Sequence, residues 1–133
     1  MYTWLLTLKD PVTGGFMMHV DGEVDIRGTY CALAVASLLN IVTPQLLKGV
    51  PSFIANCQTY EGGMGGYPGN EAHGGYTFCG VAAAVLAQAE SHINLPLVLV
   101  RTCADSWPLV MFNIPSGGVF FFSSFLSSQA LAL

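Results

Sequence analysis

Charged side chains are scarce in this chain: 133 residues include eight acidic and four basic side chains. The four cations, Lys9, Arg27, Lys48 and Arg101, are spread along the chain and form no basic stripe. Nucleic acid is therefore not an expected partner, because phosphate backbones are bound by clustered Lys and Arg. The last 28 residues carry no charge at all. This asymmetry indicates two regions of different character.

Several functional motifs are also absent. The four cysteines form no Cys-x-x-Cys pair and stand mostly in apolar runs, so we expect reduced, buried thiols in an intracellular, cytoplasmic protein. No Gly-Lys-Ser/Thr is present, which excludes a Walker-type nucleotide loop. The opening residues do not resemble a signal peptide.

No apolar run is long enough to cross a membrane without interruption. A spanning helix needs about 20 consecutive apolar residues. The run that starts at Val110 is broken by Pro115, by residues 116–118 and by later serines. We therefore do not expect a membrane as a partner, and we expect this part of the chain to be unpacked or prone to aggregation.

What the chain does contain is an internal repeat, in which residues 14–36 reappear as residues 62–84. Identical pairs at this offset of 48 are Gly14/Gly62, Gly15/Gly63, Glu23/Glu71, Cys31/Cys79, Ala34/Ala82 and Ala36/Ala84. Similar pairs include Leu5/Phe53, Leu6/Ile54 and Tyr30/Phe78. A fixed period of about 20–50 residues is the signature of a repeat architecture. Each unit has the pattern helix, Gly-Gly loop, acidic residue, helix, so the sequence predicts an all-α repeat array.

Two helices of this array are expected to be buried. Residues 30–40 and 76–88 are apolar nearly all round, which is typical of buried helices. Asp25 precedes the first of them and is suited to cap its N-terminus. Thr43 followed by Pro44 predicts the start of a further short helix.

The repeat is lost after about Leu95. A third Gly-Gly pair is due near residue 111, but the next one is Gly117-Gly118. We therefore predict a repeat region over residues 1–95 and a non-matching, poorly ordered apolar tail over residues 96–133.

The residues that could carry chemistry stand at the starts of the two buried helices. A helix N-terminus offers backbone N–H groups and a partial positive charge, and both favour anions. Gly74 and Gly75 would let the main chain approach a ligand, while His73 and Tyr76 add side-chain donors. Arg27, one repeat earlier, adds a permanent positive charge. Together these residues could hold a diphosphate.

Each of these residues also has a purely structural interpretation. Arg27 could form an ion pair with Glu23 or Asp25, and His73 could be a hydrogen-bonded turn residue. The glycines of residues 62–66 could serve only to permit a tight turn between helices.

Other site chemistries have less support from the sequence. A nucleophilic pair of Cys79 and His73 is not favoured, because Cys79 falls inside an apolar helix. The same two residues lack a recognisable zinc-ligand spacing. Glu61 and Glu71 could act as paired acids, although nothing in the sequence fixes their separation.

Four segments resemble the β subunits of protein farnesyltransferases, within the protein prenyltransferase β family. They are residues 16–27, 30–41, 57–66 and, most specifically, 71–80, which read Glu-Ala-His-Gly-Gly-Tyr-Thr-Phe-Cys-Gly. The resemblance covers roughly residues 4–95. The β subunit of type I geranylgeranyltransferase shares the repeat but is a poorer match.

The resemblance implies a partial α/α barrel, or toroid, with about two of some six helical-hairpin repeats. Its funnel would bind farnesyl diphosphate and Cys-a-a-X protein substrates, and an α subunit would complete a heterodimer. The positions of His73, Gly75 and Tyr76 would hold the diphosphate and nearby isoprenoid, with Gly74 beside them. Arg27 and Tyr30 would line the isoprenoid pocket.

The resemblance also implies zinc in the intact enzyme, held by an Asp, a Cys two residues later and a downstream His. That pattern is absent here, since Cys103 and Asp105 stand in reversed order. We therefore expect an interior slice of such a β subunit, joined after about Leu95 to unrelated sequence and inactive by itself. The alternatives are a non-catalytic two-repeat remnant that binds lipid or a partner subunit, and a fragment of a type I geranylgeranyltransferase β subunit.

Overall fold

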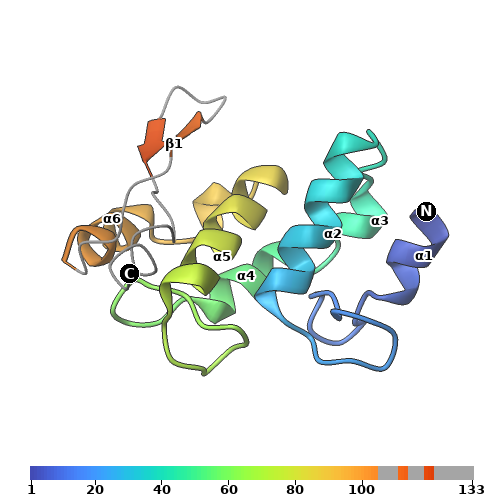
Figure 1. Cartoon of the computed structure of the whole chain (residues 1–133), viewed down its shortest axis with the longest axis horizontal. Helices are drawn as coiled ribbons and strands as arrows, with labels where there is room; N and C mark the ends of the chain where they lie inside the picture. Colours follow the sequence, from blue (N-terminus) through green and yellow to red (C-terminus); the bar gives the residue numbers. More distant parts are fainter. Residues whose placement is uncertain (105–110, 114–118, 122–133) are drawn as a thin grey trace, which may run out of the picture.

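The computed structural model describes residues 1–104, 111–113 and 119–121. Its helices are α1 (Tyr2–Thr7), α2 (Ile26–Leu38), α3 (Pro44–Leu47), α4 (Val50–Cys57), α5 (Gly74–Leu86), the 3-10 helix η1 (Glu90–His92) and α6 (Leu95–Ala104) (Figure 1). Strands β1 (Met111–Asn113) and β2 (Val119–Phe121) form an antiparallel pair. The all-α class is thus confirmed for the helical region, whereas the sequence did not predict this strand pair. Residues 96–104 of the predicted tail are helical, in α6, and residues 105–110, 114–118 and 122–133 lie outside the described residues.

The helices begin where the sequence provides capping side chains. Asp25 accepts a hydrogen bond from the N–H of Arg27 and caps α2, and Thr43 caps α3 in the same way through the N–H of Leu46. Both caps confirm the expectation from the sequence. His73 caps α5, so α2 and α5 each start earlier than their apolar runs alone predicted.

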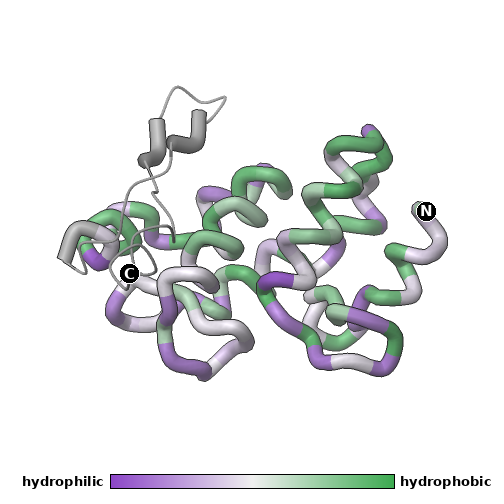
Figure 2. The backbone as a smooth tube through the Cα atoms, viewed as in Figure 1, coloured by the Kyte–Doolittle hydropathy of each residue, from purple (hydrophilic) through white to green (hydrophobic). Residues whose placement is uncertain are grey.

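Helices α2 and α5 lie side by side at the centre of the molecule (Figure 1). The ring of Tyr30 on α2 meets the ring of Phe78 on α5 edge to face, with 5.7 Å between centroids. Hydrophobic residues dominate the helices, and hydrophilic ones gather in the loops that lead into α2 and α5 (Figure 2). The two helices therefore present their N-terminal ends together at a polar rim.

Two successive units share one pattern of buried hydrogen bonds; the first contains α1, α2 and α3, and the second contains α4, α5 and η1. In the first unit the Thr29 hydroxyl accepts from the N–H of Phe16 and donates to the carbonyl four residues before it. In the second unit Thr77 does the same with the N–H of Met64. Each threonine thereby ties a glycine loop to the first turn of its central helix.

Lys9 has a similar linking role at the end of α1. Its Nζ donates to the carbonyls of Gly14, at 3.0 Å, and Leu46, at 2.8 Å. The ammonium also lies 4.6 Å from the centroid of the Phe16 ring. Burial lowers the pKa of Lys9 from 10.5 to about 8. One side chain thus joins the loop after α1 to the C-terminal part of α3.

Gln58 repeats the two bonds of Lys9 in the second unit. Its Nε2 donates to the carbonyls of Gly62, at 3.2 Å, and Asn94, at 3.1 Å. These acceptors stand 48 residues after those of Lys9, but Gln58 itself stands 49 residues after it. An amide and an ammonium therefore fill equivalent positions, because both can donate to two carbonyls.

This equivalence corrects the sequence pairing of the outer helices. The sequence pairs Leu5 with Phe53 and Leu6 with Ile54, and this pairing is wrong by one residue. Leu5 corresponds to Ile54 instead, and both side chains are buried. The turn closed by hydrogen bonds over residues 10–15 is one residue longer than the turn over residues 59–63. The extra residue shifts the register between helix and loop.

The structural repeat also continues into α6, beyond Leu95, where the repeat is no longer recognisable in the sequence. Gly14 has a φ of +82° and is so close to the backbone of Gly49 that a Cβ would collide there. Gly62 has a φ of +97° and is equally close to the carbonyl of Leu97 on α6. Helix α6 thus stands against the second unit as α4 stands against the first. The division of the chain at residue 95 stays a prediction.

Candidate functional site

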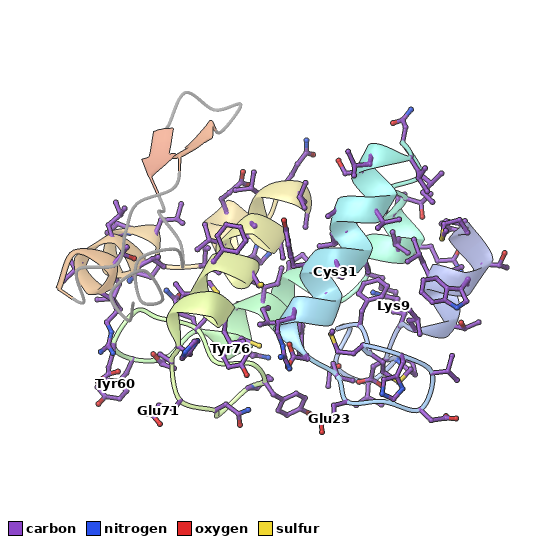
Figure 3. All side chains as sticks on the ribbon, in the orientation of Figure 1. Lys9, Glu23, Cys31, Tyr60, Glu71 and Tyr76 are labelled. Atoms are coloured by element: carbon purple, nitrogen blue, oxygen red, sulfur yellow. The ribbon has the colours of Figure 1, made fainter. Side chains whose placement is uncertain are left out.

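The structure brings Arg27 and His73 to the same aromatic ring. The guanidinium carbon of Arg27 lies 5.3 Å from the centroid of the Tyr76 ring. The His73 imidazole lies 5.4 Å from the same ring, centroid to centroid. Figure 3 shows Tyr76 at the rim where α5 begins, on the side that faces α2. The two units therefore contribute one polar group each to a shared surface.

The Arg27 guanidinium is held by a buried acid. Its Nε donates to Asp25 Oδ1 at 2.9 Å, and its Nη2 donates to Oδ2 at 2.8 Å. These hydrogen bonds to the carboxylate raise the pKa of Arg27 further above its ordinary value. The interpretation of Arg27 as a member of an ion pair is thus confirmed, with Asp25 as the partner. The guanidinium edge that carries Nη1 takes no part in this pairing.

His73 is both a helix cap and a candidate donor. Its Nδ1 lies 3.1 Å from the N–H of Gly75 and accepts a hydrogen bond from it. An imidazole that accepts at Nδ1 carries its proton on Nε2, and the side chain is exposed. One N–H of the α5 terminus, expected to be free for an anion, is therefore engaged by His73. The same imidazole has an Nε2–H donor that can bind a ligand, because the side chain is exposed.

Gly66 packs against Tyr76 and Asp25 at this surface, a role that the sequence did not indicate. Its carbonyl accepts a hydrogen bond from the N–H of Ile26 at the first turn of α2. A Cβ at Gly66 would stand 3.3 Å from Cζ of Tyr76 and 3.4 Å from Asp25 Oδ2. The repeat could have indicated this role, because the equivalent residue of the first unit is Met18, which has a large side chain where Gly66 has none. Gly66 is small because the ring and the carboxylate fill the space.

Apolar side chains follow the polar rim along α2 and α5. Tyr30 is half-buried against Phe78, and the neighbouring Cys31 is exposed. Figure 3 shows Cys31 on α2, beyond the rim marked by Tyr76. The surface thus combines a polar end with an apolar wall, as a ligand with an anionic head and a hydrocarbon chain would require.

Cys57 and Cys79 are poor nucleophiles. Burial raises the pKa of the Cys79 thiol to about 11 and that of Cys57 to about 12. The thiolate, which is the reactive form, is therefore scarce at neutral pH for both residues. The structure agrees with the sequence in giving no support to a pair of Cys79 and His73.

Glu61 and Glu71 lie away from the shared surface. Both line a hollow of about 460 Å³ between the loop after α4 and residues 69–72. Glu61 forms an ion pair with Arg101 of α6 at 2.9 Å. None of the six predicted binding residues lines this hollow. Glu61 therefore ties α6 to the loop in this structure.

A metal site does not fit the described part of the chain. There, no group of three or more His, Cys, Asp or Glu side chains is placed to hold an ion. The zinc implied by the resemblance thus has no set of ligands among these residues. None of the described helices has the length and apolar character needed to cross a membrane.

The chain is similar in sequence to known prenyltransferases. The prenyltransferase alpha-alpha toroid domain matches residues 1–104. The chain is 52% identical over 99 residues to the protein farnesyltransferase subunit beta of Pisum sativum, covering 74% of this chain and 23% of that protein. For the corresponding protein of Arabidopsis thaliana, identity is 52% over 95 residues, with 71% of this chain and 20% of that protein covered.

Similarity to other prenyltransferases is lower. Identity to the geranylgeranyl transferase type-1 subunit beta of Arabidopsis thaliana is 42% over 71 residues, covering 53% of this chain and 19% of that protein. The chain spans about a quarter or less of the length of these relatives. The resemblance to farnesyltransferase β subunits is confirmed, and the chain belongs to the prenyltransferase alpha-alpha toroid family.

Proposed function

We propose that this chain forms part of the prenyl diphosphate site of a protein farnesyltransferase. The reaction is transfer of farnesyl from farnesyl diphosphate to the cysteine of a C-terminal Cys-a-a-X motif. The main support is the convergence of Arg27 and His73 on the ring of Tyr76. A cation and an N–H donor that lie beside the same ring suit the charge of a diphosphate.

Each predicted residue has a distinct role in this proposal. Arg27 and His73 Nε2 bind the diphosphate, and Tyr76 holds the two groups together. Donors fixed in advance stabilise negative charge as it develops on the leaving diphosphate. Gly74 and Gly75 keep the start of α5 free of side chains, and Tyr30 contacts the isoprenoid.

The remaining components would come from outside the described residues. We propose that a prenyltransferase α subunit pairs with the chain and that the complex is cytoplasmic. Zinc, which the family relationship implies for the intact enzyme, would be held by ligands other than those described, and we derive no step through it.

Farnesyl diphosphate affinity of the full chain, with and without an added α subunit, tests this function. Arg27→Gln removes the guanidinium charge, and His73→Asn removes the Nε2–H donor while Asn preserves the helix cap. Loss of a hydrogen bond to a charged group should weaken binding by about 10- to 100-fold. Lys48→Gln removes an exposed cation away from the site and serves as the control. If both site variants bind as tightly as the unsubstituted chain, the proposed site is wrong.

A non-catalytic remnant is the second candidate, because stacked repeats usually need at least three units for stability. Zinc content and farnesyl transfer to a Cys-a-a-X peptide separate the two functions. Stoichiometric zinc with turnover would eliminate the remnant. Binding of farnesyl diphosphate without turnover, in the presence of the α subunit, would favour it.

A further inference from the structure

The first unit exposes a set of apolar side chains whose equivalents in the second unit are buried. With the corrected register, residues 1–9 correspond to residues 50–58, and residues 26–40 correspond to residues 74–88. Along both pairs of segments the pattern of burial is nearly the same. The pairs that change from exposed to buried are Met1/Val50, Trp4/Phe53, Val35/Ala83 and Leu39/Ala87. The two units therefore differ in burial at one small set of positions.

A glycine of the first unit helps to cover the outer helix of the second. Phe53 on α4 is 1% exposed, and its ring lies against Gly15, where a Cβ would stand 2.9 Å from two ring carbons. The equivalent residue of α1, Trp4, is 52% exposed. The aromatic ring at this position is thus buried in the unit that has a loop glycine of another unit beside it.

The inner helix of the second unit is covered by α2. Gly80 of α5 lies against α2, because a Cβ there would stand 3.5 Å from Cγ1 of Ile26. Ala83 and Ala87 follow Gly80 on the same face of the helix, at spacings of three and seven residues. They are 0% and 7% exposed, whereas the equivalent side chains on α2 are 37% and 49% exposed. The exposed positions of α2 therefore correspond to the face of α5 that packs on a neighbouring inner helix.

We propose that Met1, Trp4, Val35 and Leu39 form a docking surface for another helical hairpin of this repeat. The partner carries a glycine at the position of Gly15, against which the indole of Trp4 lies, and an inner helix that packs on α2. Such a hairpin is the occupant because one covers the same positions of the second unit.

The character and place of the docking surface agree with this occupant. End units of stable repeat arrays have polar outer faces, whereas this face is apolar. In Figure 1, α5 lies on one side of α2, and the end of the molecule that carries α1 lies on the other. The inference is independent of the proposed diphosphate site, because the docking surface includes none of the candidate binding residues.

A fusion of an added hairpin to the intact chain tests the docking surface. Residues 1–49 placed directly before Met1 reproduce the native spacing, because Gly49 then precedes Met1 as it precedes α4 in the chain. Trp4→Phe in the added hairpin and Trp107→Phe in the intact chain leave one tryptophan, Trp4 of the intact chain. Docking should move its emission to shorter wavelength and reduce its quenching by acrylamide, relative to the Trp107→Phe chain without the added hairpin.

Two adjacent leucines of α2 provide matched variants of the intact chain in this fusion. Leu39→Gln places an amide on the docking surface. In urea titrations followed by Trp4 emission, it should lower the docking equilibrium constant by about 3- to 10-fold. Leu38→Gln is the control, with a smaller effect, because its equivalent in the second unit, Leu86, stays partly exposed.

Three results would overturn the inference. Unchanged emission and quenching of Trp4 in the fusion would show that a hairpin of this repeat does not cover the surface. Equal losses in the two leucine variants would place the contact elsewhere. Shielding of Trp4 that increases with concentration in the chain without the added hairpin, with dimers in sedimentation equilibrium, would assign the surface to a second copy. Farnesyl diphosphate affinity tests the proposed function separately from all three.

Discussion

The first and second units share a scaffold but differ at the residues that face the shared surface. Thr29 and Thr77 make equivalent bonds, and so do Lys9 and Gln58. The helix caps differ, because the first unit presents an acid with its arginine and the second presents an imidazole. The repeat therefore supplies two aligned helix N-termini, and substitutions at a few positions give them complementary chemistry.

The largest expected effect concerns Gly62, the glycine of the second unit that packs against α6. Gly62→Ala should lower the free energy of unfolding by about 2–6 kcal/mol, because left-handed strain adds to a collision with the carbonyl of Leu97. Gly69→Ala is the control, since Gly69 also has a positive φ but no atoms near its Cβ position. That control should cost about 1–2 kcal/mol. Equal losses in urea denaturation would show that α6 does not pack against Gly62.

The two buried threonines test whether the units are equivalent in energy as well as in geometry. Thr29→Val and Thr77→Val each leave one buried N–H without its acceptor, at a cost of about 1–3 kcal/mol. We expect similar losses for both variants in urea denaturation. Ser at either position keeps the hydroxyl and is the matched control. A loss confined to one unit would contradict the equivalence.

A smaller effect is expected when Lys9 is replaced by glutamine, the residue at the equivalent position of the second unit. Lys9→Gln should change the free energy of unfolding by less than about 1 kcal/mol, because Gln58 donates to the two equivalent carbonyls of its own unit. Lys9→Met, which has no donor, should cost about 1–3 kcal/mol. If both variants are equally stable, the two hydrogen bonds do not determine the residue at this position.

The pH dependence of stability sharpens this test. The pKa of Lys9 is about 8 in the folded chain and 10.5 when exposed. Between those values the unfolded chain binds more protons at this site, so this residue makes stability rise with pH. From pH 8 to pH 10.5, the free energy of unfolding of the unsubstituted chain should therefore increase relative to that of Lys9→Gln. A difference that does not change over this interval would contradict the lowered pKa.

The sequence predicted the buried helices α2 and α5, the start of α3 and the caps Asp25 and Thr43, because these depend on local patterns; the roles of the six candidate residues stay a prediction. Asp25 and Thr43 are capping residues by type, and the offset of 48 holds from Gly14 onward. It did not predict the shift in register before Gly14, because a longer turn leaves no local signal. Nor did it predict the fit of Gly66 against Tyr76, since that contact joins two units. The strand pair β1–β2 was also missed, since the tail shows no alternating pattern of its own.

The most direct test of the shared surface is a crystal structure of the chain with farnesyl diphosphate. We predict diphosphate oxygens within hydrogen-bonding distance of both His73 Nε2 and the Arg27 guanidinium, with Arg27 still paired to Asp25. A diphosphate bound in the hollow lined by Glu61 and Glu71, or held by only one of the two units, would contradict the account.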